Sequence, residues 1–438
     1  MNKILDIKKW YLSNFELFEH SLNGESLKPI HKLRKDAIEK FSDMNFPTTH
    51  DEDWRFTNIS PIFDYNFNLC NDKHNLSQKD IEHFKLEKLN GNFLAFVNGH
   101  FAKDLSDIKN VTGNFIVGSI SEEIEKDSEL FKKHFGKYAK HNQQIFTALS
   151  TAFAKDGAFI FVPEGKIIEE PVQFLFIADS RNENFLIQPR NLFIAEKNAQ
   201  VKIIEHYVSL SESTYFTNAV TEIYCGENSI VEHVKLQEES NKAFHISRTE
   251  ILQERSSNFV SHSISLGAEI TRNDVNTKFN NEGAESTING LYLLSGNQLY
   301  DTHTIIDHAV PQCTSHEHYK GILTDKSRGV FNGKVIVRPD AQKTNAFQEN
   351  NNIILSNEAI INTKPQLEIF ADDVKCSHGA TIGQLDDDAL FYLKSGGIGE
   401  EQSKIMLLHA FASDIVKLIN IKQVRHYLEK ILDERFNK

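Results

Sequence analysis

Cysteine is scarce in this sequence, and its four copies are widely scattered. Cys70, Cys225, Cys313 and Cys376 lie far apart, and no two of them form a Cys-x-x-Cys pair among the 438 residues. This distribution argues against a disulfide framework and against a zinc or iron–sulfur site built from four thiolates of one chain. We therefore expect the thiols to be free and the compartment to be reducing.

Long apolar segments are also missing. No apolar run approaches the roughly 20 residues that span a bilayer, which argues against a membrane-spanning helix. Residues 1–15 mix Lys and Asp with apolar residues and lack the uninterrupted apolar core of a signal peptide. We therefore expect a cytoplasmic protein that does not bind a membrane.

An excess of positive charge is missing too, as are the common nucleotide-binding and catalytic motifs. The formal net charge is −13, which disfavours nucleic acid as a partner because phosphate binding needs clustered Lys and Arg. The sequence contains no Walker A loop, no Gly-x-Gly-x-x-Gly and no Gly-x-Ser-x-Gly. It also has no nucleophile–base pair at a recognisable spacing, so we expect that the chain is not an enzyme.

The composition, with 40% hydrophobic residues, supplies enough apolar material for a large core. Residues 1–156 are expected to form an N-terminal region of helical and mixed character, with helix over residues 1 to about 45. The segment 47–58 is expected to be an irregular, anchored loop in which Trp54 packs against the core. Residues 93–101 predict a hairpin, because Asn-Gly favours a type I′ turn.

Residues 157–385 have a different pattern. Apolar and polar residues alternate there, and the polar corners between the apolar runs contain Asn, Gly, Ser and Asp. Similar strands recur: Val201, Val231 and Val260 each begin one, at intervals of 30 and 29 residues, and Ile288 begins another 28 residues later. This spacing is typical of a solenoid.

A second set of repeated strands has the same spacing. The stretches 221-TEIY-224 and 249-TEIL-252 start 28 residues apart. Because no helix-length pattern separates the strands, we predict a mainly β fold with a right-handed parallel β-helix core over 157–385, flanked by helical regions. A β-sandwich is the structural alternative, although it would not require so regular a period.

Residues 386–438 are expected to form a C-terminal helical region. The stretch 400–436 is amphipathic, with apolar residues recurring on one face. Such a segment could cap the open end of the solenoid, which repeat folds require, or it could dock a partner. Both interpretations can hold together.

Two groups of residues could bind metal. The first lies within 301–318 and comprises His303, Asp307, His308, Cys313, His316 and His318. Its spacing matches no standard metal motif. On a strand, His303 and Asp307 would share one face and His308 would lie on the other. We therefore favour structural roles for this group.

The second group is Cys376 and His378. Two residues apart, they would project from the same face of a strand, and Gly379 would let another backbone come close. A thiolate and an imidazole suit a soft metal such as iron, but two ligands cannot hold a cluster alone. The pair is therefore either inert or part of a site shared with another chain.

Three classes of function fit these residues. The first is a scaffold in a metal pathway. The second is a β-helical polysaccharide lyase or hydrolase, although many of those are secreted. The third is a structural adaptor.

Four stretches of the sequence resemble the SufB/SufD family of the SUF iron–sulfur cluster assembly system. They are PTTHDEDWRFTN at 47–58, FTALSTAFAKDGAFIFVPEG at 146–165, LYDTHTIIDHAVPQC at 299–313 and the long stretch 329–398. Within the family the chain is similar to the SufD branch. SufB-type chains usually read Glu-His-Glu-Ala-Thr where this chain has 377-SHGAT-381, and they carry a cysteine where this chain has 348-QENNN-352.

This resemblance implies a scaffold subunit that pairs with a SufB-like paralogue and binds a SufC-like ABC ATPase. It also implies that a nascent iron–sulfur cluster forms at the interface between the two paralogues, with His378 and Cys376 as candidate ligands from this chain. The cluster would be transient and shared, and none is expected on the isolated chain. An isolated chain of this kind could form a homodimer through the same surface.

Overall fold

The computed structural model describes residues 2–70, 73–109 and 115–437. Its α-helices are α1 Asn2–Ser21, α2 Pro29–Asp43, α3 Gln78–Ile81, α4 Ile120–Lys126, α5 Glu129–His134, α6 Ile145–Ala152, α7 Asp387–Ser395, α8 Glu400–Val416 and α9 Lys422–Phe436. Its early strands are β1 Asn68–Leu69, β2 Phe93–Val97, β3 His100–Asp107, β4 Ile116–Ser119, β5 Ala158–Val162, β6 Val172–Ala178, β7 Phe185–Ile187, β8 Arg190–Ala195, β9 Gln200–Ser209 and β10 Phe216–Cys225. The later strands are β11 Ile230–Glu238, β12 Phe244–Gln253, β13 Asn258–Ser265, β14 Ile270–Phe279, β15 Glu285–Leu294, β16 Leu299–His308, β17 Thr314–Leu323, β18 Arg328–Val337, β19 Asn345–Ile354, β20 Ile360–Ile369 and β21 Lys375–Gly383.

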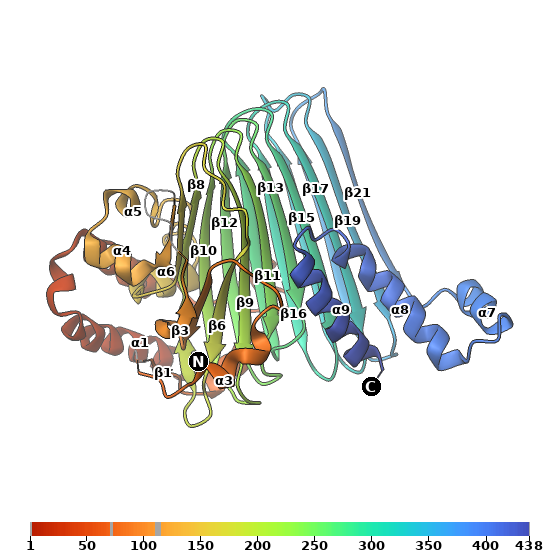
Figure 1. Ribbon diagram of the computed structural model, residues 1–438, viewed down its shortest axis with the longest axis horizontal. Coiled ribbons are helices and arrows are strands. Elements are labelled where there is room, and N and C mark those ends of the chain that lie inside the picture. The colour runs from red at the N-terminus through yellow and green to blue at the C-terminus, as the bar shows by residue number, and fades with distance from the viewer. Residues whose placement is uncertain (1, 71–72, 110–114, 438) are drawn as a thin grey trace.

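Two facing sheets form the centre of the molecule (Figure 1). Sheet A has the order β20-β18-β16-β14-β12-β10-β8-β5-β4, with β1 and β7 beside it, and sheet B has the order β21-β19-β17-β15-β13-β11-β9-β6-β2-β3. From β8 onward, successive strands alternate between the sheets, and each pairs in parallel with the strand two places along the chain. This arrangement is a parallel β-solenoid, so the mainly β prediction is confirmed and the antiparallel sandwich is wrong.

The pairing of strands tests the predicted repeats directly. Thr221 pairs with Thr249 and Val201 pairs with Val231, as their spacing predicts. Val231, however, pairs with Phe259 rather than with Val260. The corner between strands absorbs this one-residue difference, and it puts the large Phe259 ring in the interior, where it is fully buried.

The space between the two sheets, which we call the lumen, is filled with side chains rather than water. Its apolar cluster runs from Leu94 and Phe96 at the N-terminal end to Ile361 at the other. The outer face of sheet A is covered by the N-terminal helices α1, α2 and α6. The solenoid is therefore apolar on its inside and on part of each outer face.

The C-terminal helices α8 and α9 lie along the outer face of sheet B (Figure 1). Leu408, Ala412 and Ile415 of α8 share one buried cluster with sheet residues such as Val234 and Leu291. The proposed capping of the open end by the segment 400–436 is therefore wrong. These helices instead cover the side of the solenoid, because sheet B presents apolar side chains there.

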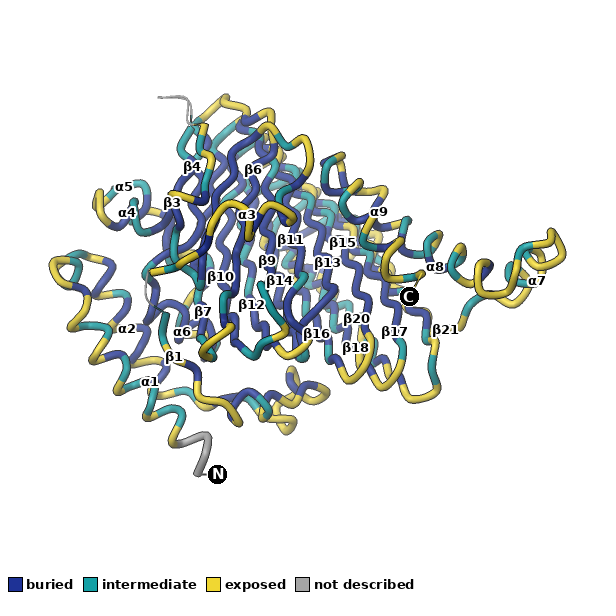
Figure 2. The backbone as a smooth tube through the Cα atoms, turned by 60° about the horizontal axis from the view of Figure 1, so that its bottom comes forward, coloured by how far each residue is buried: buried dark blue, intermediate teal, exposed yellow. Residues whose placement is uncertain are grey.

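The two ends of the solenoid differ. At the N-terminal end, β3 pairs antiparallel with β2 and β4 pairs antiparallel with β5, so each sheet finishes in a strand that runs the other way. The β2–β3 hairpin turns at Asn98 and Gly99, whose φ angles of 50° and 86° fit the predicted type I′ turn. At the other end, β20 and β21 are the last strands of their sheets, and β21 is exposed over most of its length (Figure 2).

The lumen also holds charged residues in its middle coils. Lys235 Nζ lies 2.9 Å from His245 Nε2 and donates a hydrogen bond of 2.8 Å to Asn273 Oδ1. Burial lowers the pKa of Lys235 to about 8. The carboxylate of Glu205 lies 2.9 Å from His233 Nε2 in the same interior. Hydrogen-bonded networks of this kind favour one packing arrangement, because any misalignment leaves a buried polar group unpaired.

In the described part of the chain, none of the helices combines the length and the apolar character that crossing a membrane requires.

The position of α8 predicts different effects for two neighbouring substitutions. Ile415 is fully buried between α8 and sheet B, whereas Leu418 is 45% exposed. Ile415→Ala should lower the free energy of unfolding by about 2–5 kcal/mol, because it leaves a cavity. Leu418→Ala should change it by less than about 0.5 kcal/mol. Urea unfolding of both variants measures this, and equal small effects would contradict the packing of α8 on sheet B.

Candidate metal-binding end of the solenoid

Cys376 and His378 lie on β21, the last strand of sheet B. Cys376 pairs with Ala346 of β19, and His378 pairs with Gln348. Paired residues in a parallel ladder point to the same side of the sheet. Because Ala346 and Gln348 are buried in the lumen, Cys376 and His378 both face the lumen at its open end. The structure thus brings the two predicted residues together on one face.

The two side chains differ in their surroundings. Cys376 is half-buried and packs against the apolar cluster of the lumen, and this burial raises the pKa of its thiol. His378 is exposed at the mouth of the solenoid. Gly379 points to the opposite side, where a Cβ atom would meet nothing within 4 Å. Another chain can therefore approach this part of β21 without a clash.

The donor set at this end is incomplete. A thiol and an imidazole are suitable iron ligands once the thiol has lost its proton. Within residues 2–70, 73–109 and 115–437, no group of three or more His, Cys, Asp and Glu side chains is arranged to hold a metal ion. Cys376 and His378 are therefore two candidate donors with no third donor beside them in the part of the chain that the structure describes.

Two buried polar residues lie behind His378 in the lumen. Glu317 of β17 pairs with Gln348 of β19, which pairs with His378. Gln348 Nε2 donates a hydrogen bond of 2.6 Å to Glu317 Oε2. Burial raises the pKa of Glu317 to about 7, although the hydrogen bonds from Thr304 and Gln348 oppose the shift. Sequence reasoning missed this pair, since only the register across two coils shows that these residues line up with His378.

The structure disperses the second candidate group, residues 301–318. His303 and Asp307 lie on the outer side of sheet A, and His308 points into the lumen, where its Nε2 lies 2.8 Å from Ser315 Oγ. His316 lies on the outer side of sheet B and stacks on Phe347, with ring centroids 5.3 Å apart. The predicted faces of the strand are correct, but the six residues belong to three separate surroundings.

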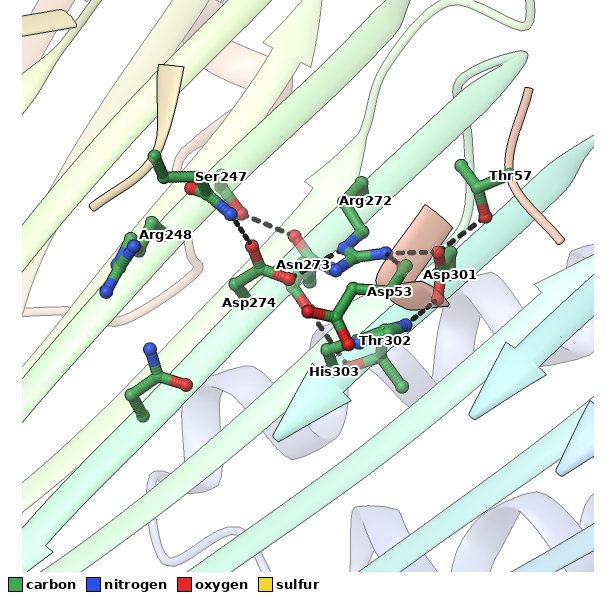
Figure 3. A network of polar contacts seen from close by, with 12 residues as sticks. Asp53, Thr57, Ser247, Arg248, Arg272, Asn273, Asp274, Asp301, Thr302 and His303 are labelled. Carbon is green, nitrogen blue, oxygen red and sulfur yellow. Dashed lines mark hydrogen bonds and ion pairs between the residues drawn. The ribbon is translucent and has the colours of Figure 1, made fainter. Parts of the chain in front are cut away.

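One member of that strand anchors the loop 47–58 to sheet A (Figure 3). Asp301 accepts hydrogen bonds from Arg272, at 2.6 Å, and from the hydroxyl of Thr57, at 2.5 Å. Burial alone would raise the pKa of Asp301, but the Arg272 guanidinium and His303 lower it to about 2. Arg272 also lies over the ring of Trp54, 4.3 Å from its centroid. The packing role expected for Trp54 is therefore confirmed.

The buried carboxyl of Glu317 predicts a pH-dependent stability. Its pKa is about 7 in the folded chain and 4.5 in its reference state, so the unfolded chain binds fewer protons between these values. The free energy of unfolding should therefore fall as pH rises through this window. Glu317→Gln removes the ionisable group and should gain about 3 kcal/mol relative to the native chain between pH 5 and pH 8.

Urea unfolding at pH 5 and pH 8 measures this difference. Glu349→Gln is the matched control, because Glu349 is an exposed carboxylate on the neighbouring strand β19. If all three proteins lose stability in parallel over this range, Glu317 is not the group that titrates.

Comparison with known proteins shows which family the chain resembles. The family described as "SUF system FeS cluster assembly, SufBD core domain" matches residues 176–411, and the one described as "SufBD protein N-terminal region" matches residues 5–174. Together these two matches extend over almost the whole solenoid, the N-terminal helices and most of α8.

Curated relatives agree with these matches. An iron–sulfur cluster assembly SufBD family protein of Synechocystis is 33% identical over 410 residues, covering 92% of this chain and 90% of the relative. The iron–sulfur cluster assembly protein SufD of Escherichia coli is 31% identical over 376 residues, covering 85% of each chain. SufD of Bacillus subtilis is 25% identical over 437 residues, covering 93% of this chain and 94% of the relative. This chain therefore belongs to the SufB/SufD family of the SUF iron–sulfur cluster assembly system.

Proposed function

We propose that this chain is a SufD-type scaffold subunit that pairs with a SufB-like paralogue through the open end of its solenoid. In this proposal the chain also binds a SufC-like ATPase through its C-terminal helices and has no turnover of its own. The nascent iron–sulfur cluster is its cargo, bound at the interface with the paralogue. The observation that carries the proposal is that two side chains able to ligate metal lie on the terminal strand β21, whose second edge has no partner strand among the described residues.

The open end has the properties of a surface that pairs with another chain. A terminal strand presents unpaired backbone N–H and C=O groups, which another strand can satisfy. Apolar side chains are exposed at this end, among them Ile369, Phe370 and Ile382. A paralogue with the same fold would bury these side chains and continue both sheets. A second copy of this chain could do the same, which supports a homodimer when the paralogue is missing.

The incomplete donor set supports a shared site. A cluster needs more ligands than Cys376 and His378 supply, so the paralogue would contribute the rest. Imidazole ligates iron in its neutral form, and a thiol must first lose its proton. Cluster loading at this interface should therefore weaken as pH falls.

The C-terminal helices offer a separate surface for the ATPase. The apolar face of α8 and α9 is already buried against sheet B, so it is not free to dock a partner. By contrast, α7 projects away from the solenoid (Figure 1) and carries Phe391 and Tyr392, which are 73% and 77% exposed. Exposed aromatic side chains are common anchors of protein interfaces. We place the ATPase contact on α7 and the adjoining start of α8, where Met406 is 42% exposed.

The ligand role of His378 predicts a loss of cluster without a loss of assembly. When the chain is co-expressed with its genomic neighbours, His378→Ala should leave the complex intact. It should lower the iron and sulfide content at least about 10-fold, because a metal site loses a direct ligand. Cys376→Ser should have a smaller effect, since a half-buried thiol with a raised pKa is a poorer ligand at neutral pH.

Ser377→Ala is the matched control for His378→Ala. Ser377 lies on the same exposed strand but points to the opposite side, in register with Phe347. Cluster content equal to that of the native complex in His378→Ala would leave both residues with a packing role only. Failure of any SufB-like chain to co-purify would instead contradict the pairing itself.

The exposed aromatics of α7 predict a surface for the ATPase. Phe391→Asp and Tyr392→Asp should each weaken co-purification of the ATPase at least about 10-fold, since interface aromatics often contribute about 2 kcal/mol. Neither substitution should affect pairing with the paralogue, because α7 packs mainly on α8 and both side chains are exposed. Leu27→Asp, at a site that is 89% exposed in the N-terminal region, is the control. A variant that carries both substitutions, Phe391→Asp and Tyr392→Asp, gives the strictest test. If it binds the ATPase as well as the native chain does, α7 is not the contact.

A further inference from the structure

A row of polar side chains leads through the lumen to His378. Glu317, Gln348 and His378 occupy the same position on β17, β19 and β21, as the pairing of these strands shows. Neighbouring strands lie about 4.8 Å apart, so side chains in one row can touch. Glu317 and Gln348 are each only 2% exposed, whereas His378 lies at the mouth. The row therefore connects the buried interior with the candidate ligand.

The hydrogen bond to Glu317 uses the donor end of the Gln348 amide. In the structure Gln348 Nε2 is directed at Glu317 and donates to its Oε2 at 2.6 Å. The carbonyl oxygen of Gln348 then remains, and this buried atom has no hydrogen-bond partner among the described residues. An unpaired buried acceptor costs about 1–3 kcal/mol. A donor that reaches this atom from the open end would remove that cost.

The facing sheet leaves room for this amide. A Cβ atom at Gly333 of β18 would lie 2.2 Å from Gln348 Nε2. Any larger residue at this position would displace the amide. Gly333 therefore leaves space for the Gln348 amide, and Glu317 holds that amide in place by a hydrogen bond.

We propose that Gln348 is a positioning residue for His378, whose ring N–H donates to the Gln348 carbonyl oxygen when the partner covers the open end. This inference rests on the proposed role of His378 as a ligand. In the free chain, the ring of His378 is exposed and makes no hydrogen bond to a residue that the structure describes. A hydrogen bond to one ring nitrogen fixes the tautomer, so the other nitrogen is neutral and directed at the metal.

Three substitutions separate this role from a structural one. Gln348→Met keeps the length of the side chain and removes the acceptor, while Gln348→Glu keeps an acceptor. Gly333→Ala leaves Gln348 in place but pushes its amide away. The matched control is Gln253→Met, because Gln253 is a fully buried glutamine of the solenoid whose carbonyl oxygen is also unpaired. Gln253 lies on β12, several coils from His378.

The probe is Co²⁺ added to the cluster-free complex of this chain with its paralogue, with binding followed by the visible spectrum of the ion. Gln348→Met and Gly333→Ala should each weaken Co²⁺ binding about 10–100-fold, the usual effect of losing a partner of a ligating histidine. Gln348→Glu, which keeps an acceptor, should bind Co²⁺ more tightly than Gln348→Met. Gln253→Met should bind Co²⁺ like the native complex, even if it lowers the thermal stability.

A double substitution separates the positioning role of Gln348 from the ligand role of His378. In a His378→Ala background, Gln348→Met should have no further effect on Co²⁺ affinity, because the residue acts through the imidazole. If His378→Ala weakens binding but Gln348→Met does not, the positioning role is wrong and the ligand role stands. If His378→Ala itself leaves Co²⁺ affinity unchanged, the proposed site fails. Equal losses in Gln348→Met and Gln253→Met would show a general effect on the fold and would also overturn the inference.

Discussion

The hydrogen-bonded ladder between successive coils is the constraint on which the rest of this structure depends. Each strand of a parallel solenoid is satisfied only by the strands before and after it in the same sheet. The first coils solve this problem with strands that run antiparallel, β4 on sheet A and β3 on sheet B. Among the described residues, no such strand follows the last coil, so one edge of β21 stays unpaired. Cys376 and His378 lie on this strand, with their side chains toward the lumen.

The same ladder aligns side chains of equal position into rows along the lumen. A residue at the mouth is therefore backed by residues that are one and two coils deeper, as His378 is backed by Gln348 and Glu317. Charged groups such as Lys235 and Glu205 in the middle coils are satisfied in the same way, by partners on adjacent or facing strands. A polar interior can form here because neighbouring and facing strands supply partners to groups such as these.

The sequence predicted the architecture better than it predicted the details. The matching stretches 221–224 and 249–252 gave the correct register, since both lie within strands of equal length that pair from end to end. Val260 gave a register wrong by one residue, because a corner changed in length and the local pattern of branched residues did not show it. That Cys376 and His378 lie on one face of a strand could be predicted from their spacing alone. Gln348 and Glu317 could not be found in this way, because their relation to His378 exists only after two coils are stacked.

The position of the C-terminal helices could not be predicted either, and it has a consequence for the site. The amphipathic pattern of 400–436 says that one face must be buried but not against what. The outer face of sheet B displays Ile204, Val234, Leu236 and Leu291, which would form a large exposed apolar patch without α8 and α9. Had these helices covered the end of the solenoid instead, that patch would be exposed and His378 would be buried by its own chain. Covering the side satisfies the apolar face and leaves the terminal strand free, so the folding of the tail and the accessibility of the candidate ligands Cys376 and His378 follow from the same packing.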